Sequence, residues 1–279
     1  MTSQFETVLY QIAAPGVARL VMNRPSARNA QNLQLTYDLN AALNQALADD
    51  GVKVIVLAGA DPVFSAGHDL RAAEKNAAGV DFAPIGTWGG FAEPGAHGLM
   101  AREQEIYLQM TRRWRDIAKP TIAAVQGRCI AGGLMLAWAC DLIVASEDAL
   151  FCDPVVAMGV CGVEWFVHPF ELGHRKAKEF LFTADTWSAA EAHRLGMANH
   201  VVPRADLETF VLTLAQKIAA KPAFALQMTK QAVNGALDAM GQPQALAHAF
   251  ALHQLCHAHN RERFGGFVDP SGFPAAVKK

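Results

Sequence analysis

Two glycine-containing segments each lie where a predicted strand ends and a predicted helix begins. The first is residues 64–70, FSAGHDL, and the second is residues 119–127, KPTIAAVQG, which lead into IAGG at 130–133. Small residues at such turns let a ligand approach the backbone, and the first amides of a helix have no partner within it. Two such turns that face one another could form an oxyanion hole, which stabilises negative charge on a carbonyl oxygen. The alternative is that the glycines only allow helices to pack closely.

The elements that must position these turns alternate between strand and helix patterns. Strands and helices that alternate at this spacing are typical of parallel sheets with crossover connections. Buried strands are predicted at 17–22, 54–57, 121–125 and 142–145, and helices at 33–47, 102–117 and 132–140. Further along the chain, only helices are predicted, at 205–220, 222–240 and 245–261. We therefore expect an α/β core over residues 1–203 and a C-terminal helical region over residues 204–279.

Composition excludes several classes of protein. Of the 279 residues, 52% are hydrophobic and 18% are charged, so the chain can bury a large core. The net charge of −2 supplies no basic surface for nucleic acid, and no apolar stretch is long enough to span a membrane. Because the N-terminus is polar, we expect no signal peptide. Five cysteines without a C-x-x-C motif predict reduced thiols and a cytoplasmic protein.

The least regular region is residues 76–98, which hold six of the 22 glycines together with Trp88 and Phe91. A loop of this length inside a compact domain is usually functional or mobile, although a simple surface excursion has the same pattern. This loop and the aromatic residues Trp138, Trp165 and Phe166 are candidates for the wall of a substrate pocket, although such aromatic side chains are more often part of the core.

Motifs of several other enzyme classes are missing from the sequence. There is no G-x-G-x-x-G after a strand, no phosphate-binding P-loop and no G-x-S-x-G nucleophile elbow. Four histidines, His248, His253, His257 and His259, are close together, and two of them share a helix face as zinc ligands would. No H-E-x-x-H motif accompanies them, and their neighbours are apolar. We therefore expect packing histidines and no metal site.

The two turns together resemble those of the crotonase superfamily, the enoyl-CoA hydratase/isomerase family, and the resemblance covers most of the chain. It includes A-G-x-D-L at 66–70 and A-G-G at 131–133. The other matching segments are LVMNRP at 20–25, NA at 29–30, CDL at 140–142, FCDP at 151–154, ELG at 171–173, LFT at 181–183 and AEAHRLG at 190–196. Together, these segments are highly specific for this family.

The resemblance implies an α/β spiral of repeated ββα units, with C-terminal helices that form trimers or dimers of trimers. It also implies acyl-CoA thioester substrates, stabilisation of a thioester enolate, and no cofactor, since coenzyme A belongs to the substrate. The oxyanion-hole donors match the backbone NH groups of His68 and Gly132. The residues that match the family's CoA- and substrate-contacting stretches are Arg28, Ala30, Ala66, Asp69, Leu70, Ile130, Gly133, Pro154, Val155 and Met158.

Both glutamates of a typical hydratase are replaced in this sequence. The first would stand three residues beyond Gly132, where this chain has Met135, and the second would follow Pro154, where this chain has Val155. Neither side chain can transfer a proton, so a two-carboxylate hydration mechanism at these positions is excluded.

Three other residues are candidates for proton transfer. Glu164 lies close to a position where other family members carry an acidic catalytic residue, and hydrophobic neighbours would raise its pKa toward the range of a useful base; a carboxylate paired with an arginine is the alternative. Asp153 is next to the lost second glutamate, or it is the N-cap of a helix that begins at Pro154. The side chain of His68 is the third, because the same A-G-H-D turn occurs in decarboxylating relatives.

Three functions remain open at this point. The first is an enolate-stabilising acyl-CoA enzyme, nominally an enoyl-CoA hydratase, with unusual proton-transfer groups. The second is isomerisation or decarboxylation on the same scaffold. The third is a protein that binds CoA thioesters without catalysis.

Overall fold

The computed structural model describes residues 5–70 and 82–272, and its centre is a six-stranded sheet. The strand order is β1-β2-β3-β4-β6-β9, with β1 antiparallel to β2 and every later pair parallel. A second sheet has the order β5-β7-β8. The strands are β1 (Val8–Ala14), β2 (Val17–Met22), β3 (Val54–Gly59), β4 (Thr121–Val125), β5 (Arg128–Ile130), β6 (Leu142–Ser146), β7 (Leu150–Cys152), β8 (Trp187–Ser188) and β9 (His200–Val202).

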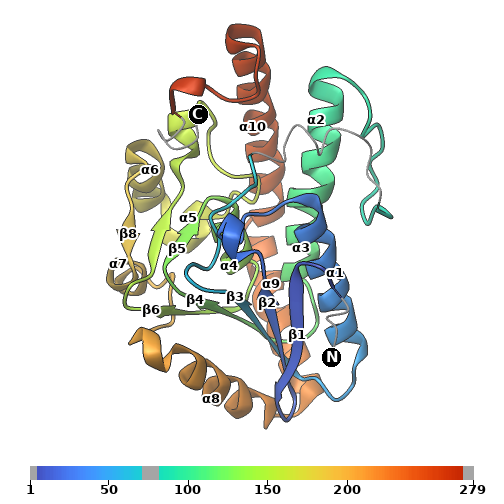
Figure 1. Ribbon diagram of the computed structural model, residues 1–279, viewed down its shortest axis with the longest axis vertical. Helices are drawn as coiled ribbons and strands as arrows, with labels where there is room; N and C mark the ends of the chain where they lie inside the picture. The colour runs from blue at the N-terminus through green and yellow to red at the C-terminus, as the bar shows by residue number, and fades with distance from the viewer. Residues whose placement is uncertain (1–4, 71–81, 273–279) are drawn as a thin grey trace.

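Helices pack on both faces of the larger sheet (Figure 1). The α-helices of the described residues are α1 (Leu33–Ala48), α2 (Gly95–Glu103), α3 (Met110–Arg115), α4 (Gly132–Trp138), α5 (His168–Leu172), α6 (His174–Thr183), α7 (Ala189–Arg194), α8 (Leu207–Ala219), α9 (Ala223–Ala239) and α10 (Gln242–Phe264). Shorter helical turns are η1 (Pro25–Ala27), the π-helical η3 (Gln104–Gln109), η4 (Pro154–Met158), η5 (Arg204–Asp206) and η6 (Pro270–Gly272).

The central strands β3, β4 and β6 are mostly apolar because both of their faces are buried. In β3, Ile55 and Leu57 belong to the larger core, whereas Val54 and Val56 face α8 on the other side of the sheet. This is the two-residue alternation that a strand imposes on its side chains. The predicted strands at 17–22, 54–57, 121–125 and 142–145 are confirmed as β2, β3, β4 and β6.

One predicted helix begins earlier than its sequence pattern indicated. Helical backbone runs without interruption from Gly95 to Arg115, through α2, η3 and α3, whereas the sequence predicted a helix over 102–117. The end of the glycine-containing region is therefore helical. Gly98 is required there, because a Cβ would lie 1.8 Å from the carbonyl oxygen of Glu93. Residues 76–81 of that region lie outside the described residues.

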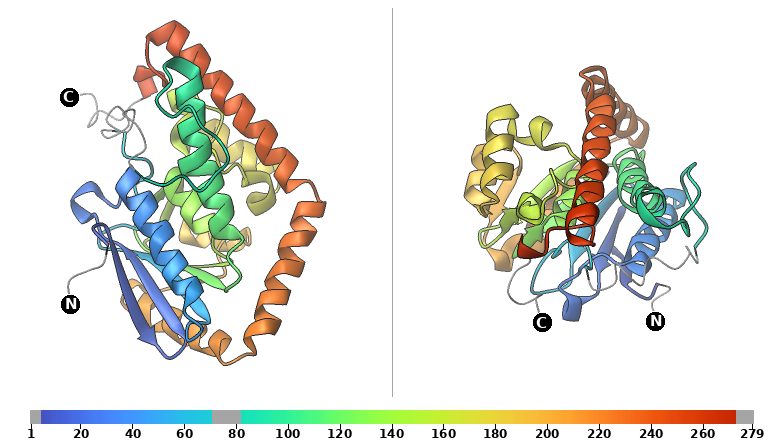
Figure 2. Two further views of the ribbon diagram at one scale, coloured as in Figure 1. Left: turned by 90° about the vertical axis from the view of Figure 1, so that its right-hand side faces the viewer. Right: turned by 90° about the horizontal axis from the view of Figure 1, so that it is seen from above.

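The C-terminal helices occupy two different places. Helix α8 packs directly on the sheet, while α9 runs away from it and α10 returns across the core beside α2 (Figure 2). The proposed division into residues 1–203 and 204–279 stays a prediction. Among the described residues, every helix is too short or too polar to cross a lipid bilayer. All five cysteines are free, as expected.

Candidate active site

The two glycine-containing turns identified in the sequence lie against each other in the structure. A Cβ added at Gly67, which has a φ of +90°, would lie 2.7 Å from the carbonyl oxygen of Ile130 and 3.3 Å from the amide nitrogen of Gly132. On the second turn, Ala131 precedes α4 with φ 47° and ψ −109°. This conformation is strained for a residue with a side chain, and such strain concentrates at functional sites.

The NH groups of His68 and Gly132 donate no hydrogen bond to a protein acceptor within the part of the chain that the structure describes. Gly132 is the first residue of α4, so its amide has no acceptor within the helix. On either side of His68 the backbone is paired, because Gly67 accepts from the NH of Gln31 and Asp69 donates to the carbonyl of Gln31, both at 2.8 Å. Two unpaired amides on facing turns are what an oxyanion hole requires.

Gln31 ties the two turns together, and sequence reasoning missed it. Its backbone pairs with the first turn, and its side-chain Nε2 donates to the carbonyl oxygen of Gly132 at 3.3 Å. A Cβ at Gly132 would lie 2.5 Å from Gln31 Oε1 and 2.4 Å from the His68 ring. Position 132 therefore accepts only glycine without movement of its neighbours. No local signal pointed to Gln31, because its partner is 101 residues away.

Glu164 lies beside His68, as a proton-transfer group at these turns would need to. Its Oε2 is 3.7 Å from His68 Nε2, its Oε1 is 3.7 Å from His253 Nε2 on α10, and the residue is only 2% exposed. Burial raises the pKa of the Glu164 carboxyl, against the opposing charges of the two histidines. The arginine partner offered as the alternative is not present among the described residues around Glu164, where histidines take that place.

Tyr107 completes the surroundings of His68 and was also missed. Its ring stacks on the imidazole with centroids 3.7 Å apart and planes 13° apart. Burial, reinforced by the charge of Glu164, raises the pKa of Tyr107 well above its usual value, so the phenol keeps its proton. Tyr107 lies in the π-helical η3, and such turns are frequent at functional sites.

Asp153 is held away from this cluster. The residue is fully buried, its Oδ2 is 2.8 Å from His168 Nε2, and it accepts from the NH groups of Val155 and Val163. The alternative interpretation of Asp153, as the N-cap of the helix that begins at Pro154, is confirmed. Because Val163 precedes Glu164, Asp153 also holds the segment that carries this carboxylate.

We expect Asp153→Asn to destabilise the protein rather than to remove its chemistry. The amide would leave His168 or one backbone NH without a charged acceptor in a fully buried place, which costs about 2–4 kcal/mol of unfolding free energy. Urea unfolding measures this loss, with the exposed Asp206→Asn as control. A variant of unchanged stability that had lost all activity per folded molecule would instead make Asp153 a catalytic residue.

The residues expected to contact CoA range from exposed to buried. Arg28 is exposed, and Asp69 is paired with Arg24 at 3.0 Å. Partly exposed members are Ala66, Asp69, Leu70, Ile130, Pro154 and Met158, and buried members are Ala30, Gly133 and Val155. Contacts of these residues with CoA stay a prediction.

The positions of the missing glutamates are apolar and buried. Met135 is 1% exposed and Val155 is 8% exposed, and both belong to the larger core. Trp138 and Trp165, expected to shape the acyl pocket, line a different cavity of about 440 Å³ beneath α9. Trp88, in the loop that is also expected to shape this pocket, is 40% exposed. Apolar side chains thus occupy both positions where the resemblance places the hydratase glutamates, and the role of Glu164 in proton transfer stays a prediction.

Comparison with known proteins agrees with this architecture. A family model for enoyl-CoA hydratase/isomerase matches residues 13–85 and 90–269. EchA13 of Mycobacterium tuberculosis, whose name assigns it provisionally to the enoyl-CoA hydratases, is 44% identical over 268 residues, which cover 94% of this chain and 84% of that protein. A crystal structure of a Mycobacterium smegmatis protein with the same provisional assignment has a TM-score of 0.84 at 43% identity, covering 96% of this chain and 100% of that one.

The chain belongs to the enoyl-CoA hydratase/isomerase family, as the sequence resemblance predicted, and it has the crotonase fold. The family consists of enzymes that act on acyl-CoA thioesters. Its members differ in reaction: 4-chlorobenzoyl coenzyme A dehalogenase-2 of an Arthrobacter species is 32% identical over 256 residues, which cover 90% of this chain and 87% of that protein. Membership therefore defines the type of substrate and leaves the reaction open.

Proposed function

We propose that this protein forms the enolate of an acyl-CoA thioester, with the NH groups of His68 and Gly132 as the oxyanion hole and Glu164 as the base. The observation that carries the proposal is the buried Glu164 carboxylate, 3.7 Å from His68, beside two turns whose amides are unpaired. In the proposed step, the α-carbon loses its proton to Glu164 and the electron pair moves onto the thioester oxygen. The two amides then stabilise the negative charge on that oxygen.

A single carboxylate favours isomerisation over ordinary hydration. One base can remove a proton from one carbon and return it to another, which moves a double bond. Hydration by the two-glutamate mechanism needs carboxylates where this chain has Met135 and Val155. Enoyl-CoA hydratase remains the nominal family assignment, and conversion of 3-enoyl-CoA into 2-enoyl-CoA is the reaction that the site supports best.

The test measures both the exchange of α-protons with the solvent and the turnover of acyl-CoA substrates. We expect the protein to exchange the α-protons of butyryl-CoA with D2O, detected by mass spectrometry, and to isomerise 3-enoyl-CoA faster than it hydrates crotonyl-CoA. Malonyl-CoA tests the decarboxylation alternative. Tight binding of acyl-CoA without exchange or turnover would contradict the proposal and would identify a CoA-thioester-binding protein instead.

We also propose a cytoplasmic homotrimer or dimer of trimers, with no cofactor for the enolate step beyond the coenzyme A of the substrate. Helices α9 and α10, with Met240 between them, support assembly, because they carry exposed apolar side chains: Phe224, Met228, Val233, Met240, Leu252 and Leu255. Patches of this kind on a protein surface mark association sites. The mass of the assembly in solution, measured by light scattering, tests this part.

A further inference from the structure

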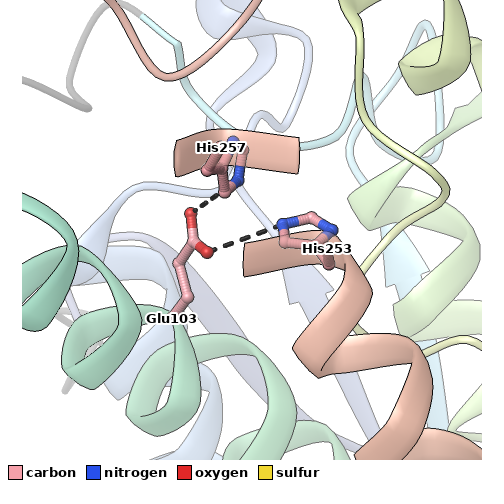
Figure 3. A group of neighbouring side chains, drawn as sticks. All are labelled: Glu103, His253 and His257. Carbon is pink, nitrogen blue, oxygen red and sulfur yellow. Dashed lines mark ion pairs between the residues drawn. The ribbon is translucent and has the colours of Figure 1, made fainter. Parts of the chain in front are cut away.

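Two helices that are distant in sequence bring together, close to Glu164, three side chains of types that bind metals. His253 and His257 lie one turn apart on α10, and Glu103 is the last residue of α2 (Figure 3). Glu103 Oε2 is 3.5 Å from His253 Nε2, and Glu103 Oε1 is 3.3 Å from His257 Nε2. All three residues are buried. The interpretation of these histidines as packing residues alone does not account for Glu103, which the sequence could not connect with them.

Hydrogen bonds to backbone carbonyls indicate which ring nitrogen of each histidine faces the cluster. His253 Nδ1 is 2.8 Å from the carbonyl oxygen of Gly162, and His257 Nδ1 is 2.5 Å from that of Phe267. A carbonyl oxygen can only accept, so both Nδ1 atoms carry the proton and both Nε2 atoms face Glu103. Histidines that bind metals have this arrangement, in which the nitrogen away from the metal donates to a carbonyl.

One inner nitrogen of the cluster lacks the hydrogen-bond partner that burial requires. His253 Nε2 is buried and has no hydrogen-bond partner within the described residues, although it faces Glu103 and Glu164. The candidate ligand atoms all lie within 4.8 Å of one another. Ligands bound at about 2.0–2.2 Å to one ion lie about 3.3–3.6 Å apart in tetrahedral geometry, and the two histidine–Glu103 distances are in this range. Each distance involves a different oxygen of Glu103, so one of these oxygens must move toward both histidines to bind the same ion with them.

We propose that Glu103, His253 and His257 bind a divalent first-row transition metal ion, with Zn²⁺ as the best-fitting member of this class. Two imidazole nitrogens and one carboxylate oxygen are a donor set found at zinc and non-haem iron sites. Gln254 donates to Glu103 Oε2 at 2.5 Å, an outer contact that orients the carboxylate. A water molecule would fill the fourth position, as at zinc sites with three protein ligands.

The proposed ion would have a structural role that is separate from enolate formation. The ion would link α10 to α2, two helices that otherwise share few contacts. This link would hold α10 next to the segment that carries Glu164. A network of ion pairs without any metal is the competing explanation of the same cluster. In that network, the charges of Glu164 and Glu103 outweigh burial and raise the pKa of His253 to about 9.

Metal binding to the full chain separates the two explanations. The protein is treated with a chelator, dialysed, and titrated at pH 8 with Zn²⁺ by calorimetry and with Co²⁺ by visible absorption. We expect one ion per chain, a dissociation constant of micromolar or tighter, cobalt bands typical of four ligands, and a rise in Tm of at least about 3 °C with excess Zn²⁺.

Matched variants assign the ion to these residues. His257→Ala should weaken Zn²⁺ binding at least about 100-fold, and Glu103→Gln, which keeps the shape of the side chain, at least about 10-fold. His259→Ala is the control, because His259 is exposed on the same helix and should bind Zn²⁺ like the unmodified chain. Circular dichroism shows whether each variant is folded. If His257→Ala is unfolded, the Zn²⁺ affinity of Glu103→Gln decides between the metal site and the ion-pair network.

Two results would overturn the metal site and leave the ion-pair network. One is the absence of saturable binding at 100 µM Zn²⁺, and the other is binding that is lost in His259→Ala but kept in Glu103→Gln. These readouts do not involve acyl-CoA. Failure of the proposed reaction therefore leaves this inference standing, and failure of metal binding leaves the reaction standing.

Discussion

The Glu164→Gln variant is expected to lose α-proton exchange by about 10²–10⁴-fold, the usual contribution of a positioned base. Glutamine has the size and shape of glutamate but cannot accept the proton, so the binding of acyl-CoA should change little. The measurement is the rate at which deuterium enters butyryl-CoA, together with the dissociation constant of the same ligand. A large loss in rate at nearly constant affinity would identify Glu164 as the base.

Glu171→Gln is the matched control for this experiment. Glu171 lies seven residues further along the chain, and burial raises its pKa to about 7, so a neutral amide is well tolerated there. It lines the cavity beneath α9 instead of the turns. Equal losses in both variants would indicate general damage, and exchange that survives Glu164→Gln undiminished would remove Glu164 from the mechanism.

Gly132→Ala carries the second large effect, an expected loss of about 10²–10³-fold in exchange and turnover. The added methyl group would lie 2.4 Å from the His68 ring and 2.5 Å from Gln31 Oε1, so both side chains or the turn itself must move. Because the two proposed donors belong to these turns, such a movement separates the amides from the thioester oxygen. The rate of α-proton exchange per folded molecule measures the effect.

Gly235→Ala provides the control for a glycine replaced within a helix. Position 235 is in α9, where an added Cβ meets nothing within 4 Å, and alanine favours a helix over glycine by about 1 kcal/mol. This variant should be active and at least as stable as the unmodified chain. If Gly132→Ala retained full activity while folded, the proposed oxyanion hole would be wrong, even if Glu164 proved essential.

Features that depend on neighbouring residues were predictable from the sequence. The parallel strands follow from buried apolar runs, and the two turns follow from glycines next to strand ends. The N-cap at Ser188 accepts from the NH of Glu191, as the capping pattern of these residues predicts. The helix over 95–103 was missed because its glycines are poor helix formers, and its contacts with α10 involve a remote part of the chain.

The amino-acid sequence by itself determined the family and the two turns, and it predicts that Met135 and Val155 replace the hydratase glutamates, because each of these features lies in a short run of consecutive residues. The tertiary structure alone decided what surrounds Glu164: Gln31 and Tyr107 beside the turns, His253 against the carboxylate, and Glu103 between two histidines. These residues come from separate elements that meet only when the sheet and its helices pack. Their contacts leave no pattern in the local sequence, since burial and distance between remote residues are properties of the folded chain.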